Sequence, residues 1–331
     1  MQGFGGAGCG TSIMAIISTL YRDRLDMVIG IQQTTLGISM ILGPMLGALL
    51  YMIGGFGFIF YTYTILFLVA VPIILFLVPA DTPYVEPEAG VTWKDVFSVR
   101  TVIMNALVII VCFSSLGALE PVLSSHLQTQ FGVPTELIAL AFVVPTVFYP
   151  VTVIVINKLP KRIERKALLL TALMIVGTAM VLIGPWSLLA IPPNLPLTII
   201  SLAMVGSGIA FGNIPPLPDM IQDAVAQLPH LPSDHISDRL SGLMTLSFFS
   251  GKTIGPPISG FFRDRIGFQD TQALLGGFIY TYAVIFGLFG GGFKALKTCT
   301  KQAQKPETLL GENEMVETKK SFYFLEEDEV L

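Results

Sequence analysis

The sequence carries little charge for its length. Asp, Glu, Lys and Arg make up 13% of the 331 residues, whereas an ordinary soluble domain carries about 25%. No such residue occurs between Asp26 and Asp81, and none between Lys166 and Asp219. Because a large soluble protein needs amphipathic helices and a charged surface, this shortage argues against one. It indicates helices that lie in lipid.

Residues typical of catalytic and metal sites are also scarce. The three cysteines and three histidines are scattered along the chain and form no metal-ligand spacing. Gly3-x-Gly5-x-x-Gly8 matches the dinucleotide-binding fingerprint in spelling, but no strand precedes it. No nucleophile with a paired base is recognisable. We therefore expect no enzyme activity, no cofactor, no bound metal and no nucleic-acid partner.

Long apolar runs fill the stretches between charges. Because a helix needs about 20 apolar residues to cross a bilayer, we divide the two charge-free stretches at Gly54-Gly55 and at Pro192-Pro193. The resulting spans are 1–19, 27–53, 57–79, 100–123, 136–157, 167–190, 196–222, 240–262 and 271–293. The sequence predicts an all-α polytopic membrane protein with about nine spans, the first of them incomplete.

The distribution of Lys and Arg predicts the orientation of these spans. Cytoplasmic loops are enriched in Lys and Arg. If the side reached after the first span is cytoplasmic, most of the 19 Lys and Arg residues lie on that side, while Arg263 and Arg265 lie opposite and Lys252 lies within a span. We therefore expect a cytoplasmic C-terminal tail. Whether the membrane is a vesicle or the plasma membrane stays open.

Two parts of the chain repeat each other at a shift of 212 residues. The shift aligns Asp26 with Asp238, Gly30 with Gly242, Gly43-Pro44 with Gly255-Pro256, and Gly55-Phe56 with Gly267-Phe268. Many transporter folds are built from such repeats. The copies are the second and eighth predicted spans, so the repeat unit is six helices long. Two full units need twelve helices, and we expect the first three to be missing before Met1.

This count divides the chain into four parts. Residues 1–79 form the end of an N-terminal bundle, 80–99 a cytoplasmic linker, 100–293 a six-helix C-terminal bundle, and 294–331 a disordered cytoplasmic tail.

Small residues and prolines mark the repeated helices. Gly37, Gly43 and Gly47 leave one helix face without side chains, so that neighbouring helices can approach closely. Pro44 removes a backbone hydrogen bond and favours a kink. Gly255 and Pro256 repeat the pattern. A gating role and ordinary helix packing are both open at this point.

These motifs resemble a known family. Gly37-x5-Gly43-Pro44-x-x-Gly47 is similar to the antiporter motif of the fifth helix in the major facilitator superfamily, and Gln2-Gly3-x-Gly5 resembles the end of its fourth-helix motif. Leu119-Glu120-Pro121 and the stretch 240–268 are similar to the vesicular amine and polyamine transporters. The resemblance covers about residues 1–293. It implies a twelve-helix fold, of which about nine helices are present, and proton-coupled exchange of a small organic cation.

Glu120 is the first candidate for a substrate or proton site. It lies about 19 residues into its span and precedes Pro121. A carboxylate inside the membrane is expensive and usually functional, although an acid near a helix end can also reach water. Lys252 lies deep in the eighth span. We expect it to pair with Glu120 or Asp219, or to meet a substrate's charge, with snorkelling to water as the alternative.

Four more residues complete the candidate set. The prolines of 215–218 break the seventh span, so Asn213 is a candidate for lining a cavity, and Asp219 is a second proton or ion-pair site or simply a helix-end acid. Gln33 and Thr245 are neutral where the resembled family often has acids. These two residues and Lys252 do not fit an amine carrier well.

Three functions follow as hypotheses. The first is a proton-coupled antiporter that moves a small organic cation by alternating access, with the lipid bilayer, a small molecule and protons as its partners. The second is a carrier of an organic anion or neutral drug. The third is a truncated membrane protein that does not transport and has a regulatory or partner-binding role. The oligomeric state is not predicted.

Overall fold

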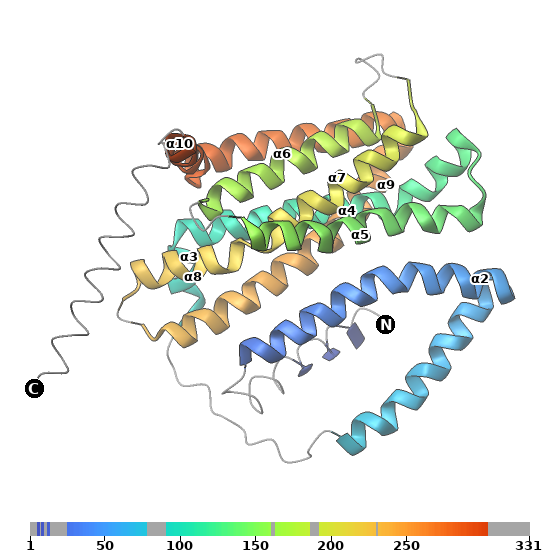
Figure 1. The fold of residues 1–331 in the computed structure, drawn as a ribbon, viewed down its shortest axis with the longest axis horizontal. Coiled ribbons are helices and arrows are strands. Elements are labelled where there is room, and N and C mark those ends of the chain that lie inside the picture. Colours follow the sequence, from blue (N-terminus) through green and yellow to red (C-terminus); the bar gives the residue numbers. More distant parts are fainter. Residues whose placement is uncertain are drawn as a thin grey trace, which may run out of the picture.

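The computed structural model describes residues 5–6, 8–9, 12–13, 25–77, 91–159, 163–185, 192–229 and 231–303. Within these ranges the chain is helical apart from short turns, and no described residue lies in a strand (Figure 1). The main helices are α2 (Leu25–Leu77), α3 (Trp93–Ser98), α4 (Arg100–Phe131), α5 (Thr135–Lys158), α6 (Arg165–Ile183), α7 (Leu195–Asn213), α8 (Pro216–Gln227), α9 (Ser233–Phe289) and α10 (Gly292–Ala303). The all-α fold class is confirmed.

Six stretches of the described chain are long and apolar enough to cross a membrane. They are Met45–Leu77, Arg100–Phe131, Leu137–Ile156, Arg165–Ile183, Leu195–Gln227 and His235–Phe289. The difference from nine predicted spans has a simple cause. α2 and α9 have 53 and 57 residues, about 80 Å or more each at 1.5 Å per residue, whereas the hydrocarbon core is about 30 Å thick. Each therefore holds two predicted spans, and the predicted span 1–19 lies mostly outside the described residues.

One glycine bends each of these long helices. Gly55 has φ 70° and ψ −168° in α2, and Gly267 has φ 83° and ψ 172° in α9. Only glycine adopts this conformation readily. The two glycines are equivalent in the 212-residue repeat, and Gly55 lies at the predicted break between spans. The repeat in sequence is thus a repeat in backbone geometry.

The hydrophobic core lies around α4, which packs against α9 and touches α6, α7 and α8. Val108 and Ile109 of α4, Leu173 of α6 and Phe286 of α9 are fully buried there. By contrast, α2 packs chiefly on α5, and its second arm stands away from the bundle (Figure 1). The structure therefore consists of a close-packed bundle from α4 onward and the two arms of α2, which lie at its edge.

Several helix boundaries differ from the predictions. α4 continues to Phe131 instead of ending at 123, because nothing stops it before Gly132, which takes the left-handed conformation with φ 63°. The linker 80–99 contains α3, whose first turn is closed by a reciprocal cap between Thr92 and Asp95.

The sequence predicts a disordered tail from residue 294, whereas in the structure α10 extends to Ala303. Ala295 of this helix is fully buried, and α10 packs against α6 and α9. Packing of an apolar face explains the helix, since packing contributes most of the stability of short helices. Residues 304–331 lie outside the described part.

Candidate functional site

The candidate site is built on a close crossing of α4 and α9. A methyl group added at Gly251 would lie 2.6 Å from the carbonyl oxygen of Ile110, and one at Gly117 would lie 3.0 Å from the carbonyl oxygen of Lys252. One at Gly255 would collide with the carbonyl oxygen of Ser114. Glycine is therefore needed at these points, because it lets the two backbones touch. The contact fixes which residues of α4 face which residues of α9.

At this crossing the Lys252 ammonium forms an ion pair with the Glu120 carboxylate. Glu120 lies 11 residues before the end of α4, about 16 Å from it along the helix axis. The Lys252 side chain is 26% exposed and the Glu120 side chain 46% exposed. The pair is therefore partly open on one side of the crossing. Of the two partners expected for Lys252, the structure selects Glu120.

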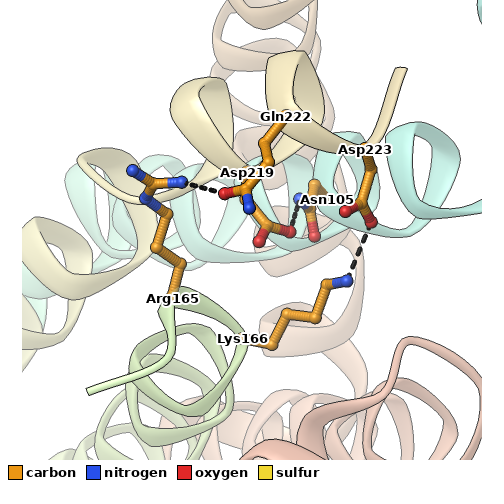
Figure 2. Close-up of polar contacts among 6 residues, drawn as sticks. All are labelled: Asn105, Arg165, Lys166, Asp219, Gln222 and Asp223. Carbon is orange, nitrogen blue, oxygen red and sulfur yellow. Dashed lines mark hydrogen bonds and ion pairs between the residues drawn. The ribbon is translucent and has the colours of Figure 1, made fainter. Parts of the chain in front are cut away.

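Asp219 lies in a separate cluster near the ends of α4 and α6 (Figure 2). We call its six residues the basic-side cluster, because it lies on the side of the bundle where most Lys and Arg residues are predicted. The cluster consists of Asn105, Arg165, Lys166, Asp219, Gln222 and Asp223.

Three contacts tie α8 to its neighbours within this cluster. The Asn105 side-chain amide donates to Asp219 Oδ2 at 2.8 Å. Lys166 Nζ lies 2.8 Å from Asp223 Oδ2, and Arg165 Nη1 donates to Gln222 Oε1 at 2.5 Å (Figure 2). Asn105 and Asp219 are both buried. The cluster therefore clamps α8 onto α4 and α6 just after the proline-rich break.

The two polar sites are far apart. Asn105 and Glu120 are 15 residues apart on α4, about 22 Å along the helix axis. Asp219 therefore does not share a site with the Glu120–Lys252 pair. Sequence reasoning missed Asn105, although an asparagine within an otherwise apolar helix is a signal that could have been followed.

The other predicted polar residues are dispersed. Asn213 donates to the hydroxyl of Tyr149 on α5 at 2.8 Å, so it joins α7 to α5. The Thr245 hydroxyl is exposed and donates to the Ser241 carbonyl oxygen of its own helix at 3.0 Å. The side chain of Gln33 lies outside the described part. The structure does not bring these residues together with Glu120.

The predicted glycine motif behaves differently in its two copies. Gly43 and Gly47 of α2 have no neighbour within 4 Å of an added methyl group, whereas Gly255 of α9 meets α4 directly. Pro256 follows within α9, and its ring lies beside Gly117. The surroundings of Gly37 and the side chain of Pro44 fall outside the described part. Close packing at the motif is thus seen in α9.

No group of three or more His, Cys, Asp or Glu residues in the described chain is arranged to hold a metal ion.

The site at the crossing of α4 and α9 offers two opposite charges. A carboxylate and an ammonium lie in stretches of α4 and α9 that carry no other Asp, Glu, Lys or Arg, and they neutralise each other.

Comparison with known proteins agrees with this architecture. Residues 1–256 match the sequence profile of the Major Facilitator Superfamily. The chain is 29% identical to the MFS-type transporter SLC18B1 of Mus musculus over 293 residues, which are 87% of this chain and 62% of the relative. It is 26% identical to the MFS-type transporter SLC18B1 of Homo sapiens over 317 residues, which are 92% of this chain and 65% of the relative.

A third relative matches a shorter part of the chain. The chain is 31% identical to the MFS-type transporter pgmG of Aspergillus terreus over 129 residues. These residues are 36% of this chain and 21% of that protein. The chain thus spans a little under two thirds of the length of the mouse and human relatives. The family profile covers more than half of the chain, and the resemblance to the vesicular amine transporter family is supported by the relatives. This multi-pass membrane protein belongs to the major facilitator superfamily.

Proposed function

We propose that the chain carries out secondary active transport, exchanging protons for a small organic cation such as an amine or polyamine. The observation that carries the proposal is the Glu120 carboxylate, which lies well inside α4 and has a cation, Lys252, as its partner. A carboxylate at this depth is costly unless a charge or proton neutralises it. A site that must always hold a positive charge suits an exchanger of cations.

The bundle offers a place for such exchange. Glu120 keeps 46% of its side-chain surface exposed, so the neighbouring side chains do not enclose it. Pro121 follows directly and lies inside α4. Because proline cannot donate a hydrogen bond to the carbonyl oxygen four residues earlier, α4 lacks one backbone hydrogen bond next to Glu120. These features support binding and release at Glu120 during alternating access.

The organisation of the whole protein enters the proposal as well. Residues 100–293 would be one six-helix half and residues 1–79 part of the other, related as parallel repeats about an axis normal to the membrane. The linker 80–99 and the C-terminal tail would lie in the cytoplasm, where the Lys and Arg distribution favours them.

The second candidate, transport of an organic anion or neutral drug, is favoured by the neutral Gln33 and Thr245 and by the cation Lys252. Its ammonium is already matched by Glu120, so an anion would have to displace a carboxylate that is fixed to the protein. This makes cation exchange the better fit to the pair.

Uptake into vesicles tests the proposal. The purified chain is reconstituted in liposomes with an acidic interior, and uptake of labelled phenethylamine, putrescine and spermidine is measured. We expect uptake that requires the proton gradient and is abolished in Glu120→Gln. Glu164→Gln is the matched control, because Glu164 is an exposed acid at the start of α6.

Unchanged uptake in Glu120→Gln would remove Glu120 from the site. Competition by organic anions but not by amines would support the second candidate. Absence of any gradient-driven uptake by the wild-type chain would contradict transport and favour a regulatory or partner-binding role.

A further inference from the structure

A glycine turn sets α10 across one end of the bundle. α9 ends at Phe289, and Gly291 follows with φ 86°, a conformation that glycine adopts readily. The chain therefore changes direction before α10 begins at Gly292. Figure 1 shows α10 nearly end on, beside the ends of α6 and α9, which run across the picture. α10 thus lies across the ends of these two helices and does not continue either of them.

The end of the bundle that α10 covers is rich in basic residues. A methyl group added at Gly291 would lie 3.6 Å from Cδ of Lys166, at the start of α6. The guanidinium carbon of Arg100, at the start of α4, lies 4.9 Å from the ring centroid of Phe289. Lys and Arg are enriched on the cytoplasmic side of membrane proteins. On the orientation that this rule predicts, α10 lies at the cytoplasmic surface of the bilayer.

One face of α10 packs on the bundle, and the next face is apolar but only partly covered. Gly292 and Ala295 are buried and belong to the packed face. Phe293 and Leu296 lie three residues apart, so they share a face of the helix, and each is 39% exposed. The described part of the protein therefore leaves these two apolar side chains partly uncovered.

A third face of α10 is basic. Lys294, Lys297 and Lys301 are spaced three and four residues apart, which places them on one side of a helix. Lys294 and Lys297 are exposed, and neither forms an ion pair within the described residues. α10 contains no Asp or Glu, and Asp223 at this end of the bundle is held by Lys166. The described residues therefore do not neutralise the charge of this face.

The order of the three faces fits a helix at the membrane interface. Because successive residues are turned by about 100° around the axis, the face of Phe293 and Leu296 lies between the packed face and the lysine face. A helix that lies in the plane of the interface turns its apolar side chains toward the acyl chains and its lysines toward the headgroups. α10 has both kinds of side chain on adjacent faces, as this position requires.

We propose that α10 is an anchor that binds anionic phospholipid, such as phosphatidylserine, in the cytoplasmic leaflet. The lysine face binds the anionic headgroups, and Phe293 and Leu296 contact the acyl chains. Cytoplasmic leaflets contain such lipids and have a negative surface potential. Because α10 packs against α6 and α9, lipid bound there holds the ends of these helices at a fixed depth. The inference rests on the predicted orientation and is independent of the transported substrate.

A protein partner fits this surface less well. A stable protein interface buries roughly 800 Å² on each partner, whereas the apolar side chains that α10 leaves exposed are Phe293 and Leu296. A lipid surface, by contrast, surrounds the end of any membrane-spanning bundle. The charge and the small apolar area of α10 together favour lipid.

Amide hydrogen exchange of the full chain in nanodiscs tests the inference. Exchange in residues 292–303 is compared between discs of phosphatidylcholine and discs that also contain phosphatidylserine. We expect exchange to be at least about fivefold slower with phosphatidylserine at low salt, which is the factor for one lysine near an anionic surface. Added salt should reduce the difference, because it screens exposed charges. Equal exchange in the two kinds of disc would overturn the inference.

Substitutions in α10 locate the effect. Replacing Lys294, Lys297 and Lys301 together by Gln should abolish the effect of phosphatidylserine and leave exchange in phosphatidylcholine discs as in the wild type. Leu296→Ala should speed exchange in both kinds of disc, because it removes a contact with the acyl chains. Lys158→Gln, at the exposed end of α5, is the matched control and should keep the full effect. An effect that persists in the triple variant would show that α10 does not hold the lipid.

A soluble headgroup separates a lipid surface from a free anion. Glycerophosphoserine added to phosphatidylcholine discs should leave exchange in α10 unchanged, because it has no acyl chains. Slowing as large as that by phosphatidylserine would contradict the membrane anchor. Exchange in residues 105–118 of α4 checks that each variant is folded. If the triple variant fails this check, Lys297→Gln alone serves, with an expected loss of about fivefold in the effect; an undiminished effect there would equally overturn the inference.

Discussion

The two copies of the repeat, α2 and α9, share a backbone but not an environment. Gly55 and Gly267 bend them in nearly the same conformation. The residues after these glycines differ completely in their surroundings: Phe56 is 70% exposed, whereas Phe268 is 8% exposed and stacks on His126 of α4, with ring centroids 3.8 Å apart. Local sequence therefore determines the bend, and the neighbouring helix determines the packing.

The glycine of the motif shows the same contrast. Gly43 faces open space, and Gly255 lies against the backbone of α4 at Ser114 and Ala118. Gly255→Ala should therefore destabilise the protein by about 3 kcal/mol, because the added methyl group meets backbone atoms that cannot move aside. Gly43→Ala should leave stability unchanged or slightly raise it, since alanine is the better helix former.

Thermal unfolding of the purified chain in detergent measures this difference. A lower midpoint for Gly255→Ala and an unchanged midpoint for Gly43→Ala would support the contrast. Equal shifts would show that the two copies pack alike.

Substitution of the bending glycines, Gly55 and Gly267, should have similar effects in the two copies, unlike substitution of Gly43 and Gly255. Gly55→Ala and Gly267→Ala each force a side chain into a conformation that only glycine adopts readily, which costs about 2 kcal/mol. We expect similar losses in thermal stability from both, because the strain is local. A loss confined to Gly267→Ala would mean that packing on α4, and not the glycine, imposes the bend.

The polar contacts of α8 test what stabilises the bundle from α4 onward, which packs more closely than α2. Asn105→Ala leaves the buried Asp219 carboxylate without its amide donor, and we expect a loss of about 1.5 kcal/mol. Lys166→Met breaks a pair whose side chains are both 24% exposed, so its effect should stay below about 1 kcal/mol. Unfolding midpoints and the rate of limited proteolysis within α8 report both effects. A larger loss in Lys166→Met than in Asn105→Ala would contradict this order.

Much of the fold could be predicted from the sequence because charge and glycine act locally. Charge-free stretches identify membrane helices, and Gly55 identifies a break between two of them. Glu120 and Lys252 could be matched because few charges occur within the predicted spans. The length of α4 could not be predicted, since the polar residues after 123 are compatible with a helix or a loop.

The neighbours of each site were harder to predict. Gly117 and Gly251 are ordinary glycines until the structure shows which face of α4 meets α9. Tyr149 becomes a partner of Asn213 only through the placement of α5 beside α7. Such partnerships depend on how helices are rotated about their axes. A single sequence whose helices are apolar on most sides contains little information about that rotation.

The glycine-lined crossing of α4 and α9 also has a consequence for motion. Gly117, Gly251 and Gly255 have no rotamers to lose, so their contacts form with little loss of side-chain entropy. For the same reason these contacts cannot adapt by changing rotamers when the helices shift. α4 and α9 should therefore move as one rigid body, and any sliding between helices must occur at interfaces lined by longer, adjustable side chains.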